Sequence, residues 1–481
     1  MCNLLYMSQE NSEYKLTVGL EIHAELATKS KMWCGCKNDP DEVRPNVNIC
    51  PVCMAHPGTL PVINKEAVRQ VLRMGTAAGG TLALDFTEFD RKNYFYPDIP
   101  KGYQLSQYKY PLVSGGEIHG VKLTRIHLEE DTGTSVHDRG DYSLVNYNRA
   151  GVPLMELVTE PVIHSAKQAS EFAKELQLLL QYLGAGEANL EKGEMRVEAN
   201  ISVSKTETFG TKVEVKNLNS FKAVEKAIEY EMNRHIALLE KGESIVQETR
   251  GWDENKGATF SQRKKENAHD YRYFPDPDLP KLKLGLLPEF AEDMLKQSLP
   301  ELPWQKRDRF VNTYKLNPQH AEFFVSDVKA CDYFDAITHK LDKPELIQLA
   351  SNYVAVDLAG LSKKPEFKQF PTADQIASLV QLISENKVSS RGAKDILNLM
   401  ALGDTNAPEA IAESNGWILK NDPEALKNTL KEVITANPQS VADYKAGKLP
   451  ALQFLVGQGM KATKGSAGPD VVKAVILELL A

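Results

Sequence analysis

Hydrophobic and polar positions alternate along much of the chain before residue 290, with the period of two that is typical of strands. These stretches predict strands at residues 15–26, 121–130, 152–160, 195–203 and 211–218. The period becomes helical after Ser165 and again after Ser220, and serine is suited to cap a helix N-terminus. Beyond residue 290 the apolar positions recur with helical spacing throughout. The pattern therefore predicts an α+β part followed by all-helical material.

The composition is that of an ordinary globular protein. The 481 residues exceed what a single core usually supports and 42% of them are hydrophobic, so we expect two or three domains. The 57 basic and 65 acidic residues leave a net charge of −8, which argues against a broadly basic nucleic-acid wrapper. No apolar run approaches the roughly 18 residues of a membrane span, and the N-terminal stretch does not read as a signal peptide. We therefore expect a cytoplasmic protein with no membrane partner.

Four of the six cysteines are close together near the N-terminus, with the spacing C-x-C-x13-C-x2-C. They are Cys34, Cys36, Cys50 and Cys53. This spacing fits two short ligand hairpins that close a tetrahedral Zn²⁺ site, and since the protein supplies all four ligands the zinc would be structural. Two alternatives remain, namely four buried thiols without a metal, and a site in which His56 replaces one cysteine. So few cysteines also indicate a reducing compartment.

Acidic side chains recur on the predicted strands. Alternation places Glu21, His23 and Glu25 on one face of the first strand, which is either a solvated face or a site. Glu156 lies in GVPLMELVTEP, a run that is apolar on both faces. An unpaired buried carboxylate costs several kcal/mol, so Glu156 needs a positive partner.

Neighbouring strands carry similar residues. They are Glu129 and Glu130, then Arg196, Glu198 and Asn200, then Lys212, Glu214 and Lys216. One interpretation is a set of buried ion pairs with Arg125, Arg196 and Lys216. The other is Mg²⁺ held by carboxylate oxygens, as phosphoryl transfer requires. His127 and His137 have no partner spacing that indicates a role, so a structural role is the default for both.

The standard nucleotide-binding motifs are absent from the sequence, which contains neither a P-loop nor a Rossmann glycine pattern. The tract RKNYFYPDIPKGYQLSQY instead combines basic and aromatic residues, among them Arg91, Lys92, Tyr94 and Tyr96. Such a tract is able to grip phosphate and to stack a base or a terminal adenosine. The alternative is a loop whose aromatic residues simply pack against one another.

Eight long segments together resemble one known family, in the order that the family has them. The segments are VGLEIHAEL, RKNYFYPDIPKGYQLSQY, LTRIHLEEDTG, NRAGVPLMELVTEP, MRVEANISV, VKNLNSF, HDYRYFPDPDLP and FLVGQGMKATKG. They resemble the B subunits of the aspartyl/glutamyl-tRNA(Asn/Gln) amidotransferases over nearly the whole chain. The resemblance implies an ATP-dependent carbon–nitrogen ligase that amidates misacylated Glu-tRNA(Gln) or Asp-tRNA(Asn). Its implied partners in a heterotrimer are an amidase-type glutaminase, which releases ammonia, and a small third protein that braces the pair.

The resemblance also implies roles for the acidic residues. The side-chain carboxylate on the tRNA would be phosphorylated by ATP and then attacked by ammonia, with Mg²⁺ held by His23, Glu130 and Glu156. Glu21, Glu198 and Glu214 would line the same pocket and the exit of an ammonia tunnel. Some family members have aspartate at the position of Glu198. Lys216 and Asn217 would contact phosphate or the tRNA terminus.

The implied fold is a cradle-like catalytic domain with a mixed sheet, a helical domain and a small helical tail domain similar to YqeY proteins. The expected boundaries are residues 1–290, 291–410 and 411–481, with a zinc-binding insertion at 33–57. Arg91, Lys92, Tyr94 and Tyr96 would contact tRNA near the active site, and Lys461 and Lys464 would do so from the tail. Gly459 lowers the helix propensity of the tail where we expect a bulkier aliphatic residue.

Two other interpretations are open. A related archaeal protein acts only on Glu-tRNA, but it carries a large inserted domain for which this chain has no counterpart. A zinc-stabilised tRNA-binding protein without catalysis would explain the cysteines and the tail, but not Glu156 among apolar residues. The choice between Gln-tRNA and Asn-tRNA as product depends on the accompanying synthetases and is not encoded in this sequence.

Overall fold

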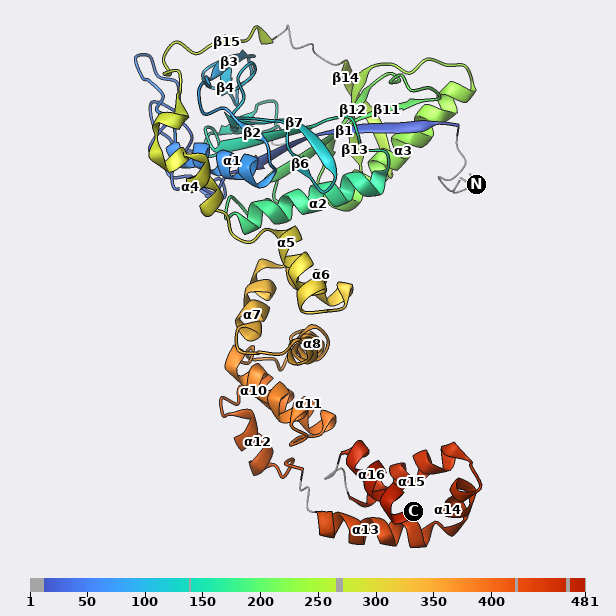
Figure 1. Ribbon diagram of the computed structural model, residues 1–481. Helices are drawn as coiled ribbons and strands as arrows, with labels where there is room; N and C mark the ends of the chain where they lie inside the picture. The colour runs from blue at the N-terminus through green and yellow to red at the C-terminus, as the bar shows by residue number, and fades with distance from the viewer. Residues whose placement is uncertain (1–12, 138–139, 265–270, 420–422, 464–467, 481) are drawn as a thin grey trace. The chain divides into compact units, whose positions relative to one another are not determined.

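The computed structural model describes residues 13–137, 140–264, 271–419, 423–463 and 468–480. The chain divides into two compact units, Met1–Pro303 and Trp304–Ala481 (Figure 1). All of the strands in the described residues lie in the first unit, and the second unit is built of helices. This arrangement confirms the predicted fold class of an α+β body followed by a helical region. The domain boundaries near residues 290 and 410 stay predictions.

A ten-stranded mixed sheet forms the body of the first unit, in the order β14-β13-β12-β11-β1-β10-β7-β5-β2 with β6 paired to β7. Its strands are β1 (Lys15–Glu25), β2 (Thr81–Leu82), β5 (Val113–Ser114), β6 (Glu117–Ile118), β7 (Val121–Glu130), β10 (Pro153–Thr159), β11 (Met195–Ser204), β12 (Val213–Leu218), β13 (Glu248–Asp253) and β14 (Ala258–Lys264). Only β12 and β13 run parallel among these pairs. The five strands predicted from alternation are confirmed as β1, β7, β10, β11 and β12.

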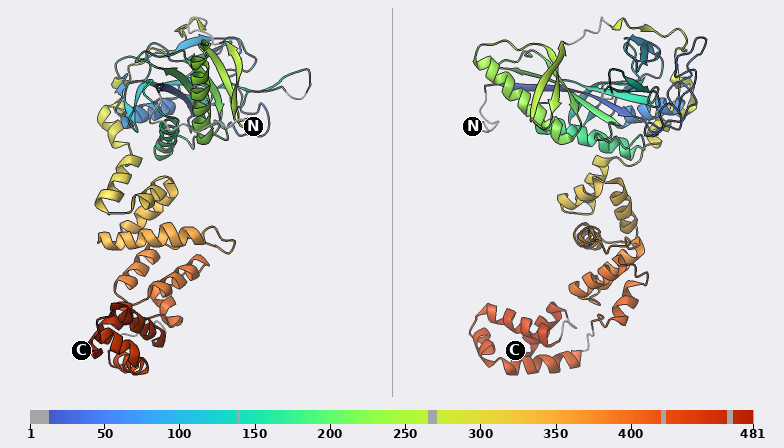
Figure 2. Two further views of the ribbon diagram at one scale, coloured as in Figure 1. Left: turned by 90° about the vertical axis from the view of Figure 1, so that its right-hand side faces the viewer. Right: turned by 180° about the vertical axis from the view of Figure 1, so that it is seen from behind.

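Three long helices cover one face of this sheet (Figures 1 and 2). They are α1 (Lys65–Ala77), α2 (Ala166–Tyr182) and α3 (Phe221–Glu240). As predicted, Ser165 and Ser220 cap α2 and α3, because each hydroxyl accepts a hydrogen bond from a backbone N–H of the first turn. Leu20, Ile22 and Ala24 of β1 are fully buried, and their alternation with polar residues directs the polar side chains to the opposite face.

A small three-stranded sheet lies over that opposite face (Figure 1). It consists of β3 (Asp90–Asn93), β4 (Tyr103–Ser106) and β15 (Phe274–Pro275). The strands β8 (Thr134–Val136) and β9 (Leu144–Asn146) form a separate hairpin, and the short helix α4 (Glu292–Gln297) packs on α1. The small sheet therefore covers part of the polar face of the large sheet, while the other face carries the helix-packed core.

The second unit consists of two helical groups. Its first group is α5 (Pro303–Asp308), a π-helix (Arg309–Thr313), α6 (Pro318–Val325), α7 (Val328–Thr338), α8 (Pro344–Asn352), a second π-helix (Tyr353–Leu358), α9 (Ala359–Leu361), α10 (Ala373–Ser384), α11 (Ser390–Ala401) and α12 (Pro408–Ser414). The core of this group contains the buried, stacked rings of Phe324 and Phe334, whose centroids lie 3.9 Å apart. The ring of Phe310 is edge-on to both. Aromatic pairs of this kind stabilise a core beyond their buried area alone.

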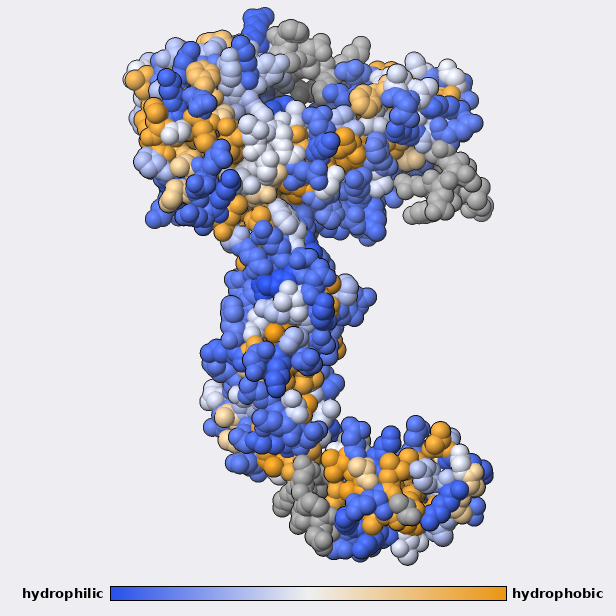
Figure 3. Space-filling model, viewed as in Figure 1, coloured by the Kyte–Doolittle hydropathy of each residue, from blue (hydrophilic) through white to orange (hydrophobic). Residues whose placement is uncertain are grey.

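The second group is a bundle of α13 (Pro423–Ala436), α14 (Pro438–Lys445), α15 (Leu449–Ala462) and α16 (Pro469–Leu480). Its core includes Leu430, Leu455 and Val472, and apolar surface remains visible over these helices (Figure 3). α15 continues through Gly459 without a break. A Cβ atom at Gly459 would lie 2.7 Å from Val472 Cγ1 and 2.8 Å from Leu430 Cδ2, so this glycine permits close helix packing.

Candidate active site

Glu156 stands at the centre of a row of polar side chains that crosses three neighbouring strands. In the sheet register, Glu156 on β10 is opposite His23 on β1 and His127 on β7. Oε2 of Glu156 lies 3.4 Å from Nε2 of His23 and 3.3 Å from Nε2 of His127. Arg125 donates to Oε1 of Glu156 from 3.2 Å. The buried Glu156 carboxylate therefore has the positive surroundings that its apolar sequence context predicts.

Three further carboxylates gather beside this row. Glu21 on β1 is directly opposite Glu198 on β11, and Glu214 comes from β12. Oxygen atoms of these three side chains lie within 4.8 Å of one another. Nζ of Lys216 lies 2.7 Å from Oε2 of Glu198, and the hydroxyl of Thr249 donates to Oε2 of Glu214 from 2.7 Å. The structure thus brings together five of the six residues that the sequence placed at the catalytic centre.

A cavity of about 690 Å³ lies over both groups of side chains. Its opposite wall is formed by Lys92 and by five tyrosines, namely Tyr94, Tyr96, Tyr108, Tyr271 and Tyr273. The rings of Tyr108 and Tyr273 stack with centroids 4.5 Å apart, and Nζ of Lys92 lies 5.3 Å from the ring centre of Tyr271. A cavity of several hundred cubic ångströms with convergent polar groups has the size of a small-molecule site.

The packing of these groups changes their protonation. Burial raises the pKa of Glu21 above its ordinary value, and the nearby carboxylates of Glu156 and Glu198 raise it further. Burial alone would lower the pKa of His23, but its hydrogen bond to Glu156 and the charge of Glu156 and Glu129 raise it to about 9. Although burial opposes ionisation of Glu156, the neighbouring His127 and His23 hold the pKa of this carboxyl well below its usual range. The cavity floor therefore attracts positive charge strongly.

The donor set fits a divalent cation. Within the described residues, Oε2 of Glu129 is buried and has no hydrogen-bond partner. Oε1 of Glu129 lies 3.7 Å from Nε2 of His23, and Glu129 shares the face of β7 that carries His127. Carboxylate oxygens with a histidine nitrogen are ligands that Mg²⁺ and Mn²⁺ accept. An orphaned carboxylate oxygen at the floor of an open cavity is the place where such a cation would be held.

Glu130 does not belong to this cluster, and the structure corrects the expected ligand set. Its carboxylate lies on the other face of β7, where it accepts hydrogen bonds from Nζ of Lys101 at 2.6 Å and from the backbone N–H of Leu105 at 2.9 Å. Successive residues of a strand point to opposite faces, so Glu129 and Glu130 cannot both reach His23. Glu129, and not Glu130, lines the cavity beside His23 and Glu156.

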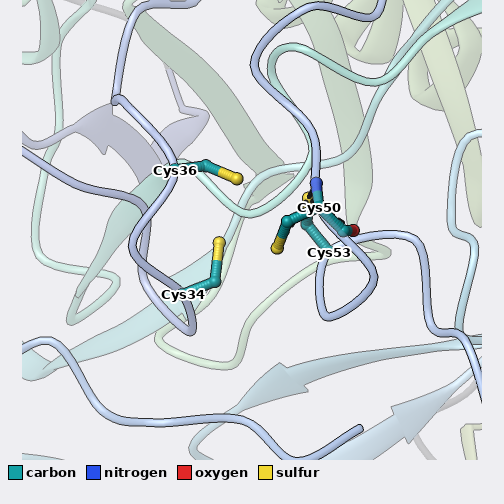
Figure 4. Close-up of side chains that lie close together, drawn as sticks. All are labelled: Cys34, Cys36, Cys50 and Cys53. Atoms are coloured by element: carbon teal, nitrogen blue, oxygen red, sulfur yellow. Dashed lines mark hydrogen bonds between the residues drawn. The ribbon is translucent and has the colours of Figure 1, made fainter.

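The cysteine loop brings its four sulfur atoms together, from two short segments of the chain (Figure 4). The sulfurs of Cys34, Cys36, Cys50 and Cys53 lie within 4.8 Å of one another. A hydrogen bond from the Cys34 thiol lowers the pKa of Cys53 to about 5, so one sulfur is readily a thiolate. Four convergent sulfurs fit a tetrahedral metal site, and the paired spacing of the sequence predicts this convergence.

Comparison with known proteins gives the family. The family described as GatB/GatE catalytic domain matches residues 16–286, and the one described as GatB domain matches residues 332–480. The aspartyl/glutamyl-tRNA(Asn/Gln) amidotransferase B subunit of Thermoanaerobacter sp. (strain X514) is 43% identical over 97% of this chain and 99% of its own length. The corresponding B subunit of Thermodesulfovibrio yellowstonii is 41% identical over 97% of this chain and 99% of its own length. The chain belongs to the GatB family. The predicted resemblance is thereby confirmed.

Several residues expected to act in this GatB-family chain lie away from the cavity. Asn217 is exposed at a bulge of β12 and has a φ of 64°, a left-handed conformation that asparagine tolerates. Arg91 is held by Asp276 at 2.6 Å and by Asp278 at 3.0 Å, so it ties β3 to the segment around β15. Lys461 is exposed on α15, and Lys464 lies outside the described residues.

The alternative interpretation of the charged residues, as buried ion pairs with Arg125, Arg196 and Lys216, agrees with part of the structure. Arg125 pairs with Glu156 and Lys216 with Glu198, whereas Arg196 pairs with Asp131 at 2.6 Å. These pairs do not balance the acidic charge around the cavity, because seven carboxylates line it together with only four lysine and arginine side chains.

Sequence reasoning missed other residues of the cavity wall and floor. The sequence predicts a structural role for His127, and the family resemblance implies Glu130, rather than Glu129, as a ligand. Alternation along β7 carried the necessary signal, because it places Arg125, His127 and Glu129 on one face. Tyr271 and Tyr273 belong to the family-like segment HDYRYFPDPDLP, but only the folded chain brings them opposite β3. No helix of the described residues is long and apolar enough to cross a membrane.

Proposed function

We propose that this chain is the B subunit of a tRNA-dependent amidotransferase and carries its activating and amidating site. The relatives named above bear this description, and the cavity has the chemistry that the reaction needs. The observation that carries the proposal is the excess of buried carboxylate around Glu156 and Glu129, on the floor of an open cavity. The proposed partners are an amidase-type glutaminase and a small third protein, which complete the heterotrimer, and a misacylated tRNA. The proposed compartment is the cytoplasm.

In the first half-reaction, an oxygen of the aminoacyl side-chain carboxylate attacks the γ-phosphorus of ATP, and the bond from that phosphorus to ADP breaks. His23, Glu129 and Glu156 would hold Mg²⁺, which supplies neutralisation of the phosphate charge. Lys92 and Lys216 line the same cavity. Although burial lowers the pKa of Lys92, the charge of Glu129 holds it well above its usual range, so this ammonium stays positive near the phosphates.

In the second half-reaction, ammonia attacks the activated carbonyl carbon and inorganic phosphate leaves with the electrons of the broken C–O bond. The attacking nitrogen must then lose a proton. Glu21 is suited to accept it, because burial and its carboxylate neighbours raise its pKa and make it a better base. Glu198 and Glu214 stand beside Glu21, and they would stabilise ammonium on its way to the activated carbonyl.

The tyrosine wall would receive the end of the tRNA. Tyr94 and Tyr96 offer ring faces beside Lys92, and Tyr96 is half exposed, so a terminal base can stack there while its phosphate meets the lysine. Arg91 would contribute by holding this wall in place through its two aspartate partners. Lys461 and Lys464 of the tail domain are proposed contacts to tRNA phosphates at a distance from the active site.

The four cysteines would hold a structural Zn²⁺. We expect about one equivalent of zinc in the purified full-length chain and its loss in Cys34→Ser, measured by atomic emission. The matched control is Cys331→Ser, which changes a buried cysteine on α7 and should leave the zinc content unchanged. Wild-type protein with four reactive thiols and no zinc would contradict the proposed metal.

The decisive experiment measures amide formation by the heterotrimeric complex on Glu-tRNA(Gln) and Asp-tRNA(Asn), with ATP, Mg²⁺ and free ammonium. Free ammonium bypasses the glutaminase. We expect Glu156→Gln to lower amidation about 10²- to 10³-fold, the usual cost of removing a group that stabilises transition-state charge. The matched control is Glu160→Gln, the same change one residue beyond the same strand, where the carboxylate accepts a hydrogen bond from the Thr124 hydroxyl and is not among the residues that line the cavity.

The two outcomes separate this function from that of a binding module. If only the wild type and Glu160→Gln give amidated tRNA and ADP, the activating site lies in this chain and the accepted tRNA is identified. If neither tRNA is amidated by the wild type although both proteins bind tRNA, a zinc-stabilised tRNA-binding protein without catalysis takes the place of the enzyme.

A further inference from the structure

Two histidines flank Glu156 on neighbouring strands, and their rings are not equivalent. His23 and His127 each lie opposite Glu156 in the sheet register, and each directs Nε2 toward the same carboxylate oxygen. The two distances are 3.4 Å and 3.3 Å. Each ring is therefore close enough to contact a cation held at Glu156, and distance alone does not distinguish them.

Arg125 distinguishes the two rings. Its Nε lies 3.4 Å from Nδ1 of His127 in a hydrogen bond. A guanidinium only donates, so Nδ1 of His127 accepts and its lone pair is used there. The hydrogen of the neutral ring is then on Nε2, which is directed toward Glu156. Both nitrogens of His127 are engaged, and neither has a lone pair left for a metal ion.

A histidine that binds a metal has the reverse arrangement, since one nitrogen presents its lone pair to the metal while the other donates to a carboxylate or carbonyl oxygen. We propose that His127 and Arg125 are positioning residues that hold the Glu156 carboxylate for the cation, and that His23 supplies the ligating nitrogen. The inference rests on the proposed function, because it takes a divalent cation to be held at Glu156.

The geometry around Glu156 agrees with this division of roles. Arg125 donates from Nη2 to Oε1 while His127 faces Oε2, so both oxygens are held from the side of β7. His127 is only 2% exposed, so the close packing around it restricts rotation of its ring. His23 lies on the far side of Glu156, where its Nε2 is 3.7 Å from Oε1 of Glu129. The other oxygen of Glu129, Oε2, lies 3.9 Å from Nε2 of His127.

The test uses Mn²⁺ as the probe, bound to the full-length chain in the absence of ATP and tRNA. Pulsed electron paramagnetic resonance detects histidine nitrogens that are bonded directly to Mn²⁺. We expect nitrogen coupling in the wild type, its loss in His23→Gln and its retention in His127→Gln. Glutamine retains an amide N–H that is able to replace Nε2–H of His127, whereas it replaces a ligating histidine nitrogen poorly.

Binding constants for Mn²⁺ complete the test. Removal of a residue that orients a metal ligand typically weakens metal binding by about 10- to 100-fold. We expect a loss of that size for His127→Ala and near-normal binding for His127→Gln. Arg125→Lys retains the positive charge but loses the guanidinium fork, so it should also weaken binding by about 10-fold or more. Its side chain is 32% exposed, so this variant tests the assignment without emptying a core position.

Different results overturn different claims. Loss of nitrogen coupling in His127→Gln with its retention in His23→Gln would reverse the assignment while leaving the proposed cation site in place. Wild-type Mn²⁺ affinity in both His127→Ala and Arg125→Lys would remove the positioning role. A wild-type chain that binds no Mn²⁺ at Glu156 would overturn the cation site of the proposed function and this inference together.

Discussion

Two buried glutamates of the first unit have similar neighbours but opposite surroundings. Glu156 on β10 and Glu231 on α3 are each almost fully buried, and each contacts histidine and arginine. Glu231 accepts hydrogen bonds from Nε and Nη2 of Arg234 and from the Thr259 hydroxyl, and Nε of Arg250 lies 3.2 Å away. The carboxylate of Glu231 is therefore completely satisfied by its neighbours.

The surroundings of Glu156 are different in kind. Its cluster borders a large cavity that is lined by seven carboxylates and only four lysine and arginine side chains. Oε2 of Glu129 is buried there and has no hydrogen-bond partner in the part of the chain that the structure describes. Burial of a carboxylate beside histidine is thus not by itself a sign of a functional site. The sign is acidic charge in excess of the available cations, at a place that a ligand is able to enter.

Replacement of Glu231 should have the largest effect, and the effect should be on stability. Glu231→Gln leaves the partly buried Arg234 without its carboxylate and takes from Arg250 one of its two carboxylate partners, and breaking a buried pair typically costs about 3 to 5 kcal/mol. We expect chemical denaturation of the first unit to shift by this free energy of unfolding, while amidation by the remaining folded protein stays close to normal.

The matched control is Glu229→Gln on the exposed side of the same helix, which should change stability by less than about 0.5 kcal/mol. The comparison fails if Glu231→Gln unfolds no more easily than this control, or if it abolishes amidation in protein that remains folded.

The stability of the wild type and of Glu231→Gln should also depend differently on pH. Burial opposes ionisation of Glu231, but its hydrogen bonds with His235, Arg234 and Thr259 lower its pKa to about 2. Since this folded value lies below the ordinary value of about 4.3, the ionised group stabilises the fold above that pH and loses this contribution as the pH falls toward 2. We expect the stability difference between wild type and Glu231→Gln to shrink by about 3 kcal/mol between pH 5 and pH 2.

Denaturation curves measured at several pH values check this expectation, with the full-length chain in each. A stability difference that stays constant through acid pH would mean that Glu231 is not ionised in the folded protein. That result would contradict the ion pairs that the geometry indicates for Glu231.

The adjacent residues Glu129 and Glu130 allow the same substitution to be compared inside and outside the cavity. Glu129→Gln should raise the Mg²⁺ concentration for half-maximal, ammonium-dependent amidation by about 10- to 100-fold, because it weakens the donor set. Glu130→Gln should leave that concentration unchanged, because its carboxylate is engaged by Lys101 and Leu105 on the other face of β7. Titration of Mg²⁺ for both variants checks the correction, and equal shifts in the two would contradict it.

Asn217 should show the smallest effect. Its backbone is left-handed and its side chain is exposed, so Asn217→Gly should leave amidation and stability almost unchanged. Asn217→Val should cost about 1 to 2 kcal/mol of stability, because a branched side chain is strained in this conformation. Loss of amidation in the well-folded glycine variant would instead restore the predicted role of the asparagine side chain in substrate binding.

Much of this protein was predictable from local pattern. The alternation of β1, β7, β10, β11 and β12 identified the strands, because one face of each strand must be buried and side chains alternate with a period of two. The apolar run around Glu156 marked its carboxylate as exceptional, because burial without a partner is costly. The paired cysteine spacing predicted a convergent set of four sulfurs, because the ligands of each pair are close in the chain.

Other features were decided only by the tertiary structure. The choice of Glu129 over Glu130 depends on which face of β7 meets β10 and the cavity, and two adjacent glutamates look alike in the sequence. The pairing of Arg196 with Asp131, the two aspartates that hold Arg91, and the tyrosines opposite the carboxylates all join segments far apart in the chain. The sequence by itself determined which residues are costly to bury, and the strand register decided which of those residues meet, because contacts across a sheet depend on pairing between strands and not on spacing within one.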